Sequence, residues 1–186
     1  MAKTLSKMNA LGSIAPDFQL LDTVSGIERS LQELRGSTGT LIMFICNHCP
    51  FVKHIQPELV RLASDYLSRG ISIVAISAND VENYPQDSPD NMKKEAQHWG
   101  YTFPYLYDHT QEVAKAYDAA CTPDFFLFDE GLACVYRGQL DGSTPGNGVP
   151  LTGSSLRAAI DQLLAGESID ADQKPSVGCN IKWRTS

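Results

Sequence analysis

A Cys-x-x-Cys sequence lies between a predicted strand and a predicted helix, and it limits the folds open to this chain. Residues 41–46 form an apolar run too short for a buried helix, so they predict a central strand buried on both faces. From Val52 to Tyr66, apolar residues recur at steps of three and four, which predicts an amphipathic helix. Cys46 and Cys49 therefore stand at a strand-to-helix junction.

That junction gives the two sulfur atoms a distinctive chemical environment. The first turn of a helix carries unpaired N–H groups and the positive end of the helix dipole, and both favour a thiolate over a thiol. Cysteines so placed can have pKa values lowered from about 8.5 to roughly 3.5–7.5. Pro50 fits the first helical position and so places Cys49 at the N-cap. His48, when protonated, adds a positive charge that stabilises the reduced pair, and a dithiol stabilised in its reduced form is an oxidant.

The spacing of the pair also bears on its chemistry. Two cysteines three positions apart across a tight turn can close a disulfide with little backbone movement. Half of a zinc site and unreactive thiols are the alternatives. A structural zinc site usually needs a second cysteine pair, and the remaining cysteines, Cys121, Cys134 and Cys179, are scattered singly. The sequence therefore favours redox chemistry, with no metal and no cofactor.

Length and charge narrow the classes of function. With 186 residues, 42% of them hydrophobic, the chain is long enough to bury a sizeable core. We expect a single domain over residues 12–183, preceded by a polar leader over residues 1–11. A net charge of −7 provides no basic surface for nucleic acid or for an anionic membrane, so neither is an expected partner.

The N-terminus and the cysteine count bear on the compartment. Residues 1–10 contain no continuous apolar stretch of the length of a secretory signal, and no later segment approaches transmembrane length. Five cysteines, an odd number, argue against a structural disulfide framework. These features predict a cytoplasmic protein.

Predicted strands and helices alternate along the chain, which indicates βαβ units and a largely parallel sheet. Near the N-terminus, the turn at residues 25–26 predicts a hairpin, and Ser30 with Glu33 forms a capping-box pattern for a one-turn helix. Ser154 is the expected cap of the last helix. The other expected elements are strands over 71–77, 103–108, 124–129 and 132–137, with a two-residue turn at 130–131, and helices over 91–100, 112–119 and 156–164.

The C-terminal tail is expected to pack back on the domain. Val177, Ile181 and Trp183 are too apolar for a solvated end. Whether Cys179 reaches the cysteine pair stays open. Cys134 is expected in the core.

Three strings of the sequence together resemble a known family. They are residues 46–52 (CNHCPFV), 121–129 (CTPDFFLFD) and 175–183 (PSVGCNIKW). They look like a peroxiredoxin-like branch of the redoxin (AhpC/TSA) group, in the thioredoxin-like superfamily. The resemblance extends roughly from Gly12 to Trp183. It implies an α/β thioredoxin-like fold, with a central mixed β-sheet flanked by α-helices and an N-terminal hairpin extension.

The resemblance also implies roles for residues near the pair. Pro123, preceded by Thr122, matches the cis-proline that faces the CxxC of thioredoxins and exposes backbone for an extended partner segment; the alternative is an ordinary trans proline. Cys49 followed by Pro50 resembles the peroxidatic Cys-Pro of peroxiredoxins. Peroxiredoxins also use an arginine near the strand that Pro123 opens to polarise peroxide. This sequence has proline there, which counts against peroxide reduction.

The sequence therefore predicts a thiol-disulfide oxidoreductase whose Cys46–Cys49 pair acts on a disulfide- or dithiol-bearing protein or a small thiol. A thiol peroxidase with antioxidant activity and Cys49 as its peroxidatic cysteine is the enzymatic alternative. A redox sensor or a metal-binding protein with a third ligand such as Cys121 is the non-enzymatic one. Thioredoxin analogy favours Cys46 as the nucleophile, whereas the N-cap position favours Cys49. Cys121 and Cys179 are possible accessory thiols.

The histidines outside the motif carry less information. His54 lies one turn into the helix that follows the pair, where a solvated side chain is expected. His98 and His109 belong to no pattern. The sequence does not indicate an oligomeric state.

Overall fold

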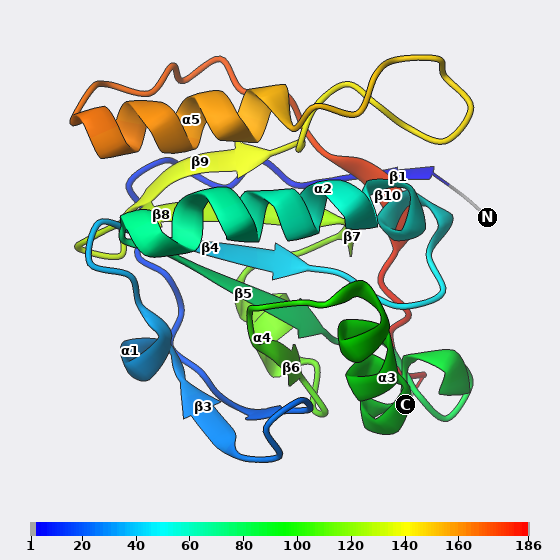
Figure 1. Ribbon diagram of the computed structural model, residues 1–186. Helices are drawn as coiled ribbons and strands as arrows, with labels where there is room; N and C mark the ends of the chain where they lie inside the picture. Colours follow the sequence, from blue (N-terminus) through cyan, green and yellow to red (C-terminus); the bar gives the residue numbers. More distant parts are fainter. Residues whose placement is uncertain (1–2, 186) are drawn as a thin grey trace.

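The computed structural model describes residues 3–185, which form a 7-stranded mixed sheet flanked by helices and a smaller 3-stranded sheet (Figure 1). The large sheet has the strand order β3-β2-β6-β5-β4-β8-β9, and the small one has the order β1-β10-β7. In chain order the elements are β1 (Lys3–Leu5), β2 (Gln19–Asp22), β3 (Glu28–Ser30), α1 (Leu31–Leu34), β4 (Gly39–Phe44), α2 (Pro50–Tyr66), η1 (Leu67–Arg69), β5 (Ile71–Ser77), η2 (Pro85–Asp87), α3 (Pro89–Trp99), β6 (Tyr105–Tyr107), α4 (Glu112–Ala116), β7 (Cys121–Thr122), β8 (Asp124–Asp129), β9 (Cys134–Gly138), α5 (Ser154–Ala165) and β10 (Val177–Asn180).

Strand β4 is buried on both faces, as its apolar run predicted. Leu41 and Met43 belong to the core layer that α2, α3 and α5 cover. Ile42 and Phe44 belong to the opposite layer, which α1 and α4 cover. The strand is parallel to β5 and antiparallel to β8, so it is hydrogen-bonded on both edges. This two-sided burial fixes the point from which the cysteine pair leaves the sheet.

The N-terminal hairpin and the helix that follows it are confirmed. Strands β2 and β3 pair antiparallel, and Ser30 caps α1. The Ser30 hydroxyl accepts a hydrogen bond from the Glu33 amide, while the Glu33 carboxylate accepts one from the Ser30 amide. Both halves of the capping box are therefore present.

Several expected boundaries differ from those in the structure by one to three residues, and two of them have an identifiable cause. Strand β9 begins at Cys134 rather than at Leu132, because Leu132 has a left-handed φ of 63° and lies in a connection longer than two residues. The N-cap of α5 is Gly153 rather than Ser154. The Asp141 carboxylate accepts hydrogen bonds from the amides of Thr152 and Gly153, so a side chain at the other end of the loop between β9 and α5 sets the start of this helix.

The tail packs back on the protein, as predicted. Strand β10 lies between β1 and β7, and Ile181 is fully buried beyond it. Trp183 is the exception, being 39% exposed. The stretch expected as a leader is not separate from the fold, because Lys3–Leu5 forms β1 and pairs antiparallel with β10. Residues 1 and 2 lie outside the described part of the chain.

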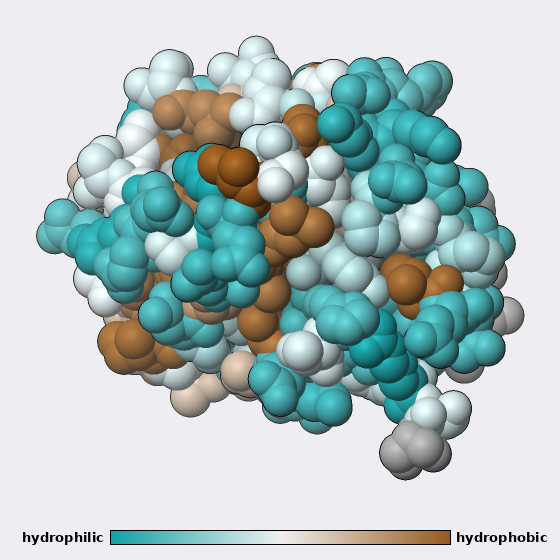
Figure 2. Space-filling view, turned by 90° about the horizontal axis from the view of Figure 1, so that it is seen from below, coloured by the Kyte–Doolittle hydropathy of each residue, from teal (hydrophilic) through white to brown (hydrophobic). Residues whose placement is uncertain are grey.

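The surface offers no continuous apolar belt on the side seen from below (Figure 2), where hydrophilic residues separate the apolar ones into patches. Exposed large apolar side chains include Leu21 and Ile27 of the N-terminal hairpin region. Within residues 3–185, none of the helices has the length and hydropathy needed to cross a membrane.

Candidate active site

The cysteine pair occupies the segment between β4 and α2. Cys49 is the N-cap of α2 with extended backbone angles, and Pro50 follows at the first helical position, as predicted. The Cys49 sulfur makes no side-chain cap hydrogen bond with the first turn, although the Val52 amide is near enough to favour its thiolate. Both cysteines are buried: Cys46 is 2% exposed and Cys49 is 0% exposed. Exposure therefore does not single out Cys46 as the accessible sulfur.

Thr122 joins the pair to the opposite side of the site. The Thr122–Pro123 bond is cis, which confirms the prediction from sequence. The Thr122 hydroxyl lies 3.4 Å from Sγ of Cys46, and its carbonyl oxygen lies 3.2 Å from Sγ of Cys49. The residue before the cis-proline thus contacts both sulfurs of the motif.

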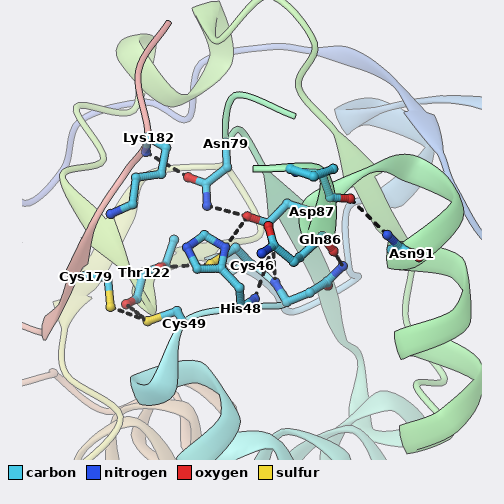
Figure 3. Close-up of polar contacts among 12 residues, drawn as sticks. Cys46, His48, Cys49, Asn79, Gln86, Asp87, Asn91, Thr122, Cys179 and Lys182 are labelled. Carbon is cyan, nitrogen blue, oxygen red and sulfur yellow. Dashed lines mark hydrogen bonds and ion pairs between the residues drawn. The ribbon is translucent and has the colours of Figure 1, made fainter. Parts of the chain in front are cut away.

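A third sulfur belongs to the site. Cys179 lies in β10, and its Sγ is 2.9 Å from Sγ of Cys49, a contact visible in Figure 3. Cys179 is itself 2% exposed. The tail therefore brings to the pair a thiol that the sequence could only name as a possible accessory.

The three thiols differ sharply in acidity. The pKa of Cys49 is lowered to about 5, and the neighbouring Cys46 thiol is the largest cause, acting against the opposing effect of burial. The contacts of Cys49 with Cys179 and Thr122 contribute to the same lowering. The same contact with Cys49, together with burial, raises the pKa of Cys46 well above its ordinary value. Burial and the Cys49 contact raise the pKa of Cys179 to about 12. Of the three thiols, Cys49 is the one whose pKa is lowered, while the pKa values of the other two are raised.

His48, between the two cysteines, is bound by Asp87. The Nδ1 atom of His48 lies 2.6 Å from Oδ2 of Asp87, and its ring stacks on Tyr84 with the centroids 5.3 Å apart. Figure 3 shows Asp87 reaching the His48 ring from the loop after β5. The sequence argument considered His48 beside the cysteines alone. In the structure, its imidazole is hydrogen-bonded to the carboxylate of Asp87.

Asp87 is the site residue that sequence reasoning missed. It is 0% exposed, and its carboxylate accepts hydrogen bonds from the backbone amides of Asn47 and His48 and from the side chain of Asn79. Burial raises its pKa, but the hydrogen bonds from His48 and Asn79 outweigh burial and leave the pKa below its ordinary value. Because β4 and β5 are parallel, the segments that follow them meet at one edge of the sheet, and that rule was the available signal.

The other candidate residues lie elsewhere or play structural parts. The Cys121 thiol contacts the Pro123 carbonyl oxygen at 3.5 Å, and burial raises its pKa. Cys134 is in the core, as predicted. His54 is half-buried and 2.7 Å from the Ser143 hydroxyl rather than on a solvated face.

His98 and His109 stand apart from the cysteines. The His98 ring packs against Trp99, and His109 contacts Arg184. Neither residue contributes to the site within the contacts of the described chain. This agrees with their lack of any sequence pattern.

The residues that could hold a metal ion differ from the set proposed from sequence, which was the cysteine pair with a third ligand such as Cys121. Ligand atoms of Cys46, His48 and Asp87 all lie within 4.8 Å of one another. A sulfur, an imidazole nitrogen and a carboxylate oxygen are ligands that zinc accepts. Here the histidine and the carboxylate are hydrogen-bonded to each other, so an ion would have to replace that bond.

Solved structures similar to this chain bear on its fold. An uncharacterized conserved protein from Geobacillus kaustophilus, known from its crystal structure, is 60% identical and superposes with a TM-score of 0.98, over 100% of this chain and 98% of that one. The thioredoxin domain of a thiol-disulfide oxidoreductase from Bacteroides vulgatus superposes with a TM-score of 0.58 at 21% identity, over 70% of this chain and 89% of that one. The second likeness confirms the thioredoxin-like fold.

Relatives in sequence are more distant. Thiol-disulfide oxidoreductase ResA from Geobacillus thermodenitrificans (strain NG80-2) is 31% identical over 121 residues, which are 65% of this chain. The match spans 64% of the length of that relative. Residues 11–135 match the AhpC/TSA family, a stretch that includes the cysteine pair and the cis-proline. The chain therefore belongs to the AhpC/TSA family.

Proposed function

We propose that this protein is a thiol-disulfide oxidoreductase in which Cys49 is the nucleophile and Cys46 the resolving cysteine. The observation that carries the proposal is the placement of Cys49 at the N-cap of α2 and in contact with Thr122 and Cys179, where its pKa is lowered to about 5 while that of Cys46 is raised. A dithiol in this state has one sulfur charged for attack and a second poised beside it. The printed name of the ResA relative supports the same class of reaction.

The reaction consists of two exchanges. The Cys49 thiolate attacks one sulfur of a substrate disulfide, and the other substrate sulfur leaves as a thiolate. Cys46 then loses its proton and attacks Cys49, which forms the Cys46–Cys49 disulfide and releases the second substrate sulfur. The substrate is reduced and the protein oxidised by the same two electrons. The reverse sequence oxidises a substrate dithiol.

His48 and Asp87 serve the second exchange. Cys46 has a raised pKa and needs a base to remove its proton. A ligand atom of His48 and one of Asp87 lie within 4.8 Å of the Cys46 sulfur, a separation that one water molecule can bridge. The bond to Asp87 fixes the orientation of the imidazole. We assign His48 the role of proton acceptor and Asp87 that of a positioning residue.

Thiol peroxidase activity, and with it an antioxidant role, is the second candidate. The low pKa of Cys49 beside Pro50 favours it, since peroxide oxidises thiolates to sulfenic acid. No arginine is among the influences on Cys49 within the described residues, and the arginines Arg137, Arg157 and Arg184 are hydrogen-bonded elsewhere. We therefore expect peroxide to react more slowly than disulfides.

The test compares the two oxidants on the reduced protein. Rates with glutathione disulfide and with hydrogen peroxide are measured by stopped-flow fluorescence, in the wild type and in the Cys49→Ser and Cys46→Ser variants. We expect faster reaction with the disulfide, no reaction without Cys49, and slower resolution of the mixed disulfide without Cys46. Faster reaction with hydrogen peroxide than with the disulfide would favour the thiol peroxidase over the thiol-disulfide oxidoreductase. Insensitivity to loss of Cys49 would remove both candidates.

A further inference from the structure

Strand β10 holds a third cysteine against the nucleophile from the side opposite the CxxC segment. The sulfurs of Cys179 and Cys49 are 2.9 Å apart. A disulfide bond measures about 2.05 Å, so bonding would require the two atoms to approach by less than about 1 Å. Cys49 thus has two neighbouring sulfurs, one from the motif and one from the tail.

The position of Cys179 is fixed by backbone pairing on both sides. It is opposite Thr122 in β7 and opposite Lys3 in β1. The Ser176 hydroxyl donates to the Pro123 carbonyl oxygen at 2.7 Å, and the Ile181 amide donates to the Ala120 carbonyl oxygen at 3.2 Å. Hydrogen bonds before and after Cys179 therefore hold β10 along the cis-proline segment.

Gly178 gives independent evidence for the close packing of β10 against the cis-proline segment. A Cβ atom at residue 178 would lie 2.0 Å from the Thr122 carbonyl oxygen and 3.1 Å from the Pro123 nitrogen. The obstructing atoms are backbone and cannot turn aside. The absence of a side chain at 178 is what lets β10 approach the cis peptide and bring Cys179 to Cys49.

We propose that Cys179 is a third redox-active cysteine, and that Cys49 exchanges between a disulfide with Cys46 and a disulfide with Cys179. The proposal rests on the proposed function, which supplies the first disulfide. It adds a residue from the tail to the reaction and gives the oxidised protein two forms.

The exchange is balanced within the protein. Cys179, as a thiolate, attacks Sγ of Cys49 in the Cys46–Cys49 disulfide. The Cys49–Cys179 bond forms as the Cys46–Cys49 bond breaks, and Cys46 leaves with the electron pair. Cys46 then takes up a proton equivalent to the one that Cys179 lost. The numbers of thiols and disulfides stay the same, so no further oxidant or reductant takes part.

Oxidation of the pair also prepares Cys179 for attack. In the reduced site, the charge and hydrogen bonding of Cys49 are among the causes that raise the pKa of Cys179. That charge disappears once Cys49 is bonded to Cys46. Lys182, whose positive charge favours the Cys179 thiolate, remains. The Cys49–Cys179 form would join the tail covalently to α2 and leave Cys46 as a thiol.

The test maps disulfides in the full-length protein after oxidation with glutathione disulfide. Proteolysis without reduction, followed by mass spectrometry, separates the two forms: trypsin leaves Cys46 and Cys49 in one peptide and Cys179 in another. We expect both disulfides in the wild type and the Cys49–Cys179 cross-link in Cys46→Ser. The cross-link should be lost in Cys179→Ser and Gly178→Val, whereas the buried control Cys134→Ala should retain it.

The outcomes separate this proposal from the function on which it rests. A Cys46–Cys49 disulfide that forms and exchanges with dithiols, with no cross-link to Cys179 in the wild type or in Cys46→Ser, would overturn the third-cysteine proposal alone. Absence of every disulfide would overturn both. A cross-link that joins Cys46 rather than Cys49 to Cys179 would also contradict the exchange.

Discussion

The imidazole of His48 is held by the carboxylate of Asp87 at 2.6 Å, although 39 positions separate the two residues in the chain. The same carboxylate accepts the amide of Asn47 at 2.7 Å and the side chain of Asn79 at 2.8 Å. One buried acid thus fixes the conformation of the CxxC segment as well as the orientation of its histidine.

Replacing Asp87 with asparagine should destabilise this segment. The new side chain would turn an NH₂ group toward donors that a carboxylate accepts, and an unsatisfied buried donor costs about 1–3 kcal/mol. We expect a loss of that size in the free energy of unfolding, measured with urea. The exposed residue Glu82 lies in the same loop, and Glu82→Gln is the control.

The kinetic effect of this substitution distinguishes positioning from stability. If Asp87 orients His48 for proton transfer, Asp87→Asn should slow resolution of the mixed disulfide more than its formation, and should alter the pH profile of resolution. Equal slowing of both steps with an unchanged pH profile would contradict the positioning role.

Removing the thiol of Cys46 should make Cys49 less acidic. The Cys46 hydrogen bond is the largest influence that lowers the pKa of Cys49. A hydrogen bond to a charged group is worth about 1.5–3 kcal/mol, so Cys46→Ala should raise the pKa of Cys49 by about 1 to 2. Thiolate absorbance followed against pH measures this value, with Cys134→Ala as the control. An unchanged titration would show that the Cys46 thiol does not stabilise the Cys49 thiolate.

Cys49 should contribute increasing stability to the reduced protein as the pH rises from about 5 toward 8.5. The pKa of Cys49 is about 5 in the folded protein and about 8.5 in an unfolded chain, so the unfolded state binds more protons between these values. The stabilisation is complete above the unfolded pKa and is lost as the pH falls through the folded one. Urea unfolding across this range measures it.

Comparison with a Cys49→Ser variant isolates the contribution of Cys49 to that pH dependence. The raised pKa values of Cys46 and Cys179 act above pH 8.5, and the lowered pKa of Asp87 acts below its ordinary value. Burial raises the pKa of Asp124, which opposes the Cys49 effect in both proteins alike. The Cys49→Ser variant should show a flatter profile, and a slope equal to that of the wild type would refute the assignment of the thiolate.

Truncation after Ala171 should lower the melting temperature of the protein. It removes β10, the middle strand of the small sheet, together with the buried side chain of Ile181. A loss of about 2 kcal/mol would correspond to roughly 4–8 °C for a chain of this size. A chain ending at Trp183 keeps β10 and serves as the control. An unchanged melting temperature in the shorter chain would mean that the tail adds nothing to stability.

The local parts of the site were predictable because their causes are local. The apolar run that begins at Leu41 predicted a buried strand, although that strand ends at Phe44, and Pro50 predicted the start of a helix with Cys49 as its N-cap. The capping box is likewise formed by residues that are close in sequence, Ser30 and Glu33. In each case the side chains that determine the structure are neighbours in sequence.

The remaining parts depend on which strands lie next to each other. Asp87 reaches His48 because β4 and β5 are parallel neighbours, and Cys179 reaches Cys49 because β10 pairs with β7. Neither strand pairing can be predicted from the local pattern of residues. The start of α5 depends on a contact within the preceding loop, where Asp141 accepts hydrogen bonds from the amides of Thr152 and Gly153.

The pairing of β1 with β10 bears on how the site is completed during synthesis. Lys3 is made long before its partner Cys179, so the two strands cannot meet until Cys179 has been made. Cys46 and Cys49 are present throughout that interval without the strand that later borders them. A growing chain therefore passes through a stage in which its CxxC lacks the contact with Cys179.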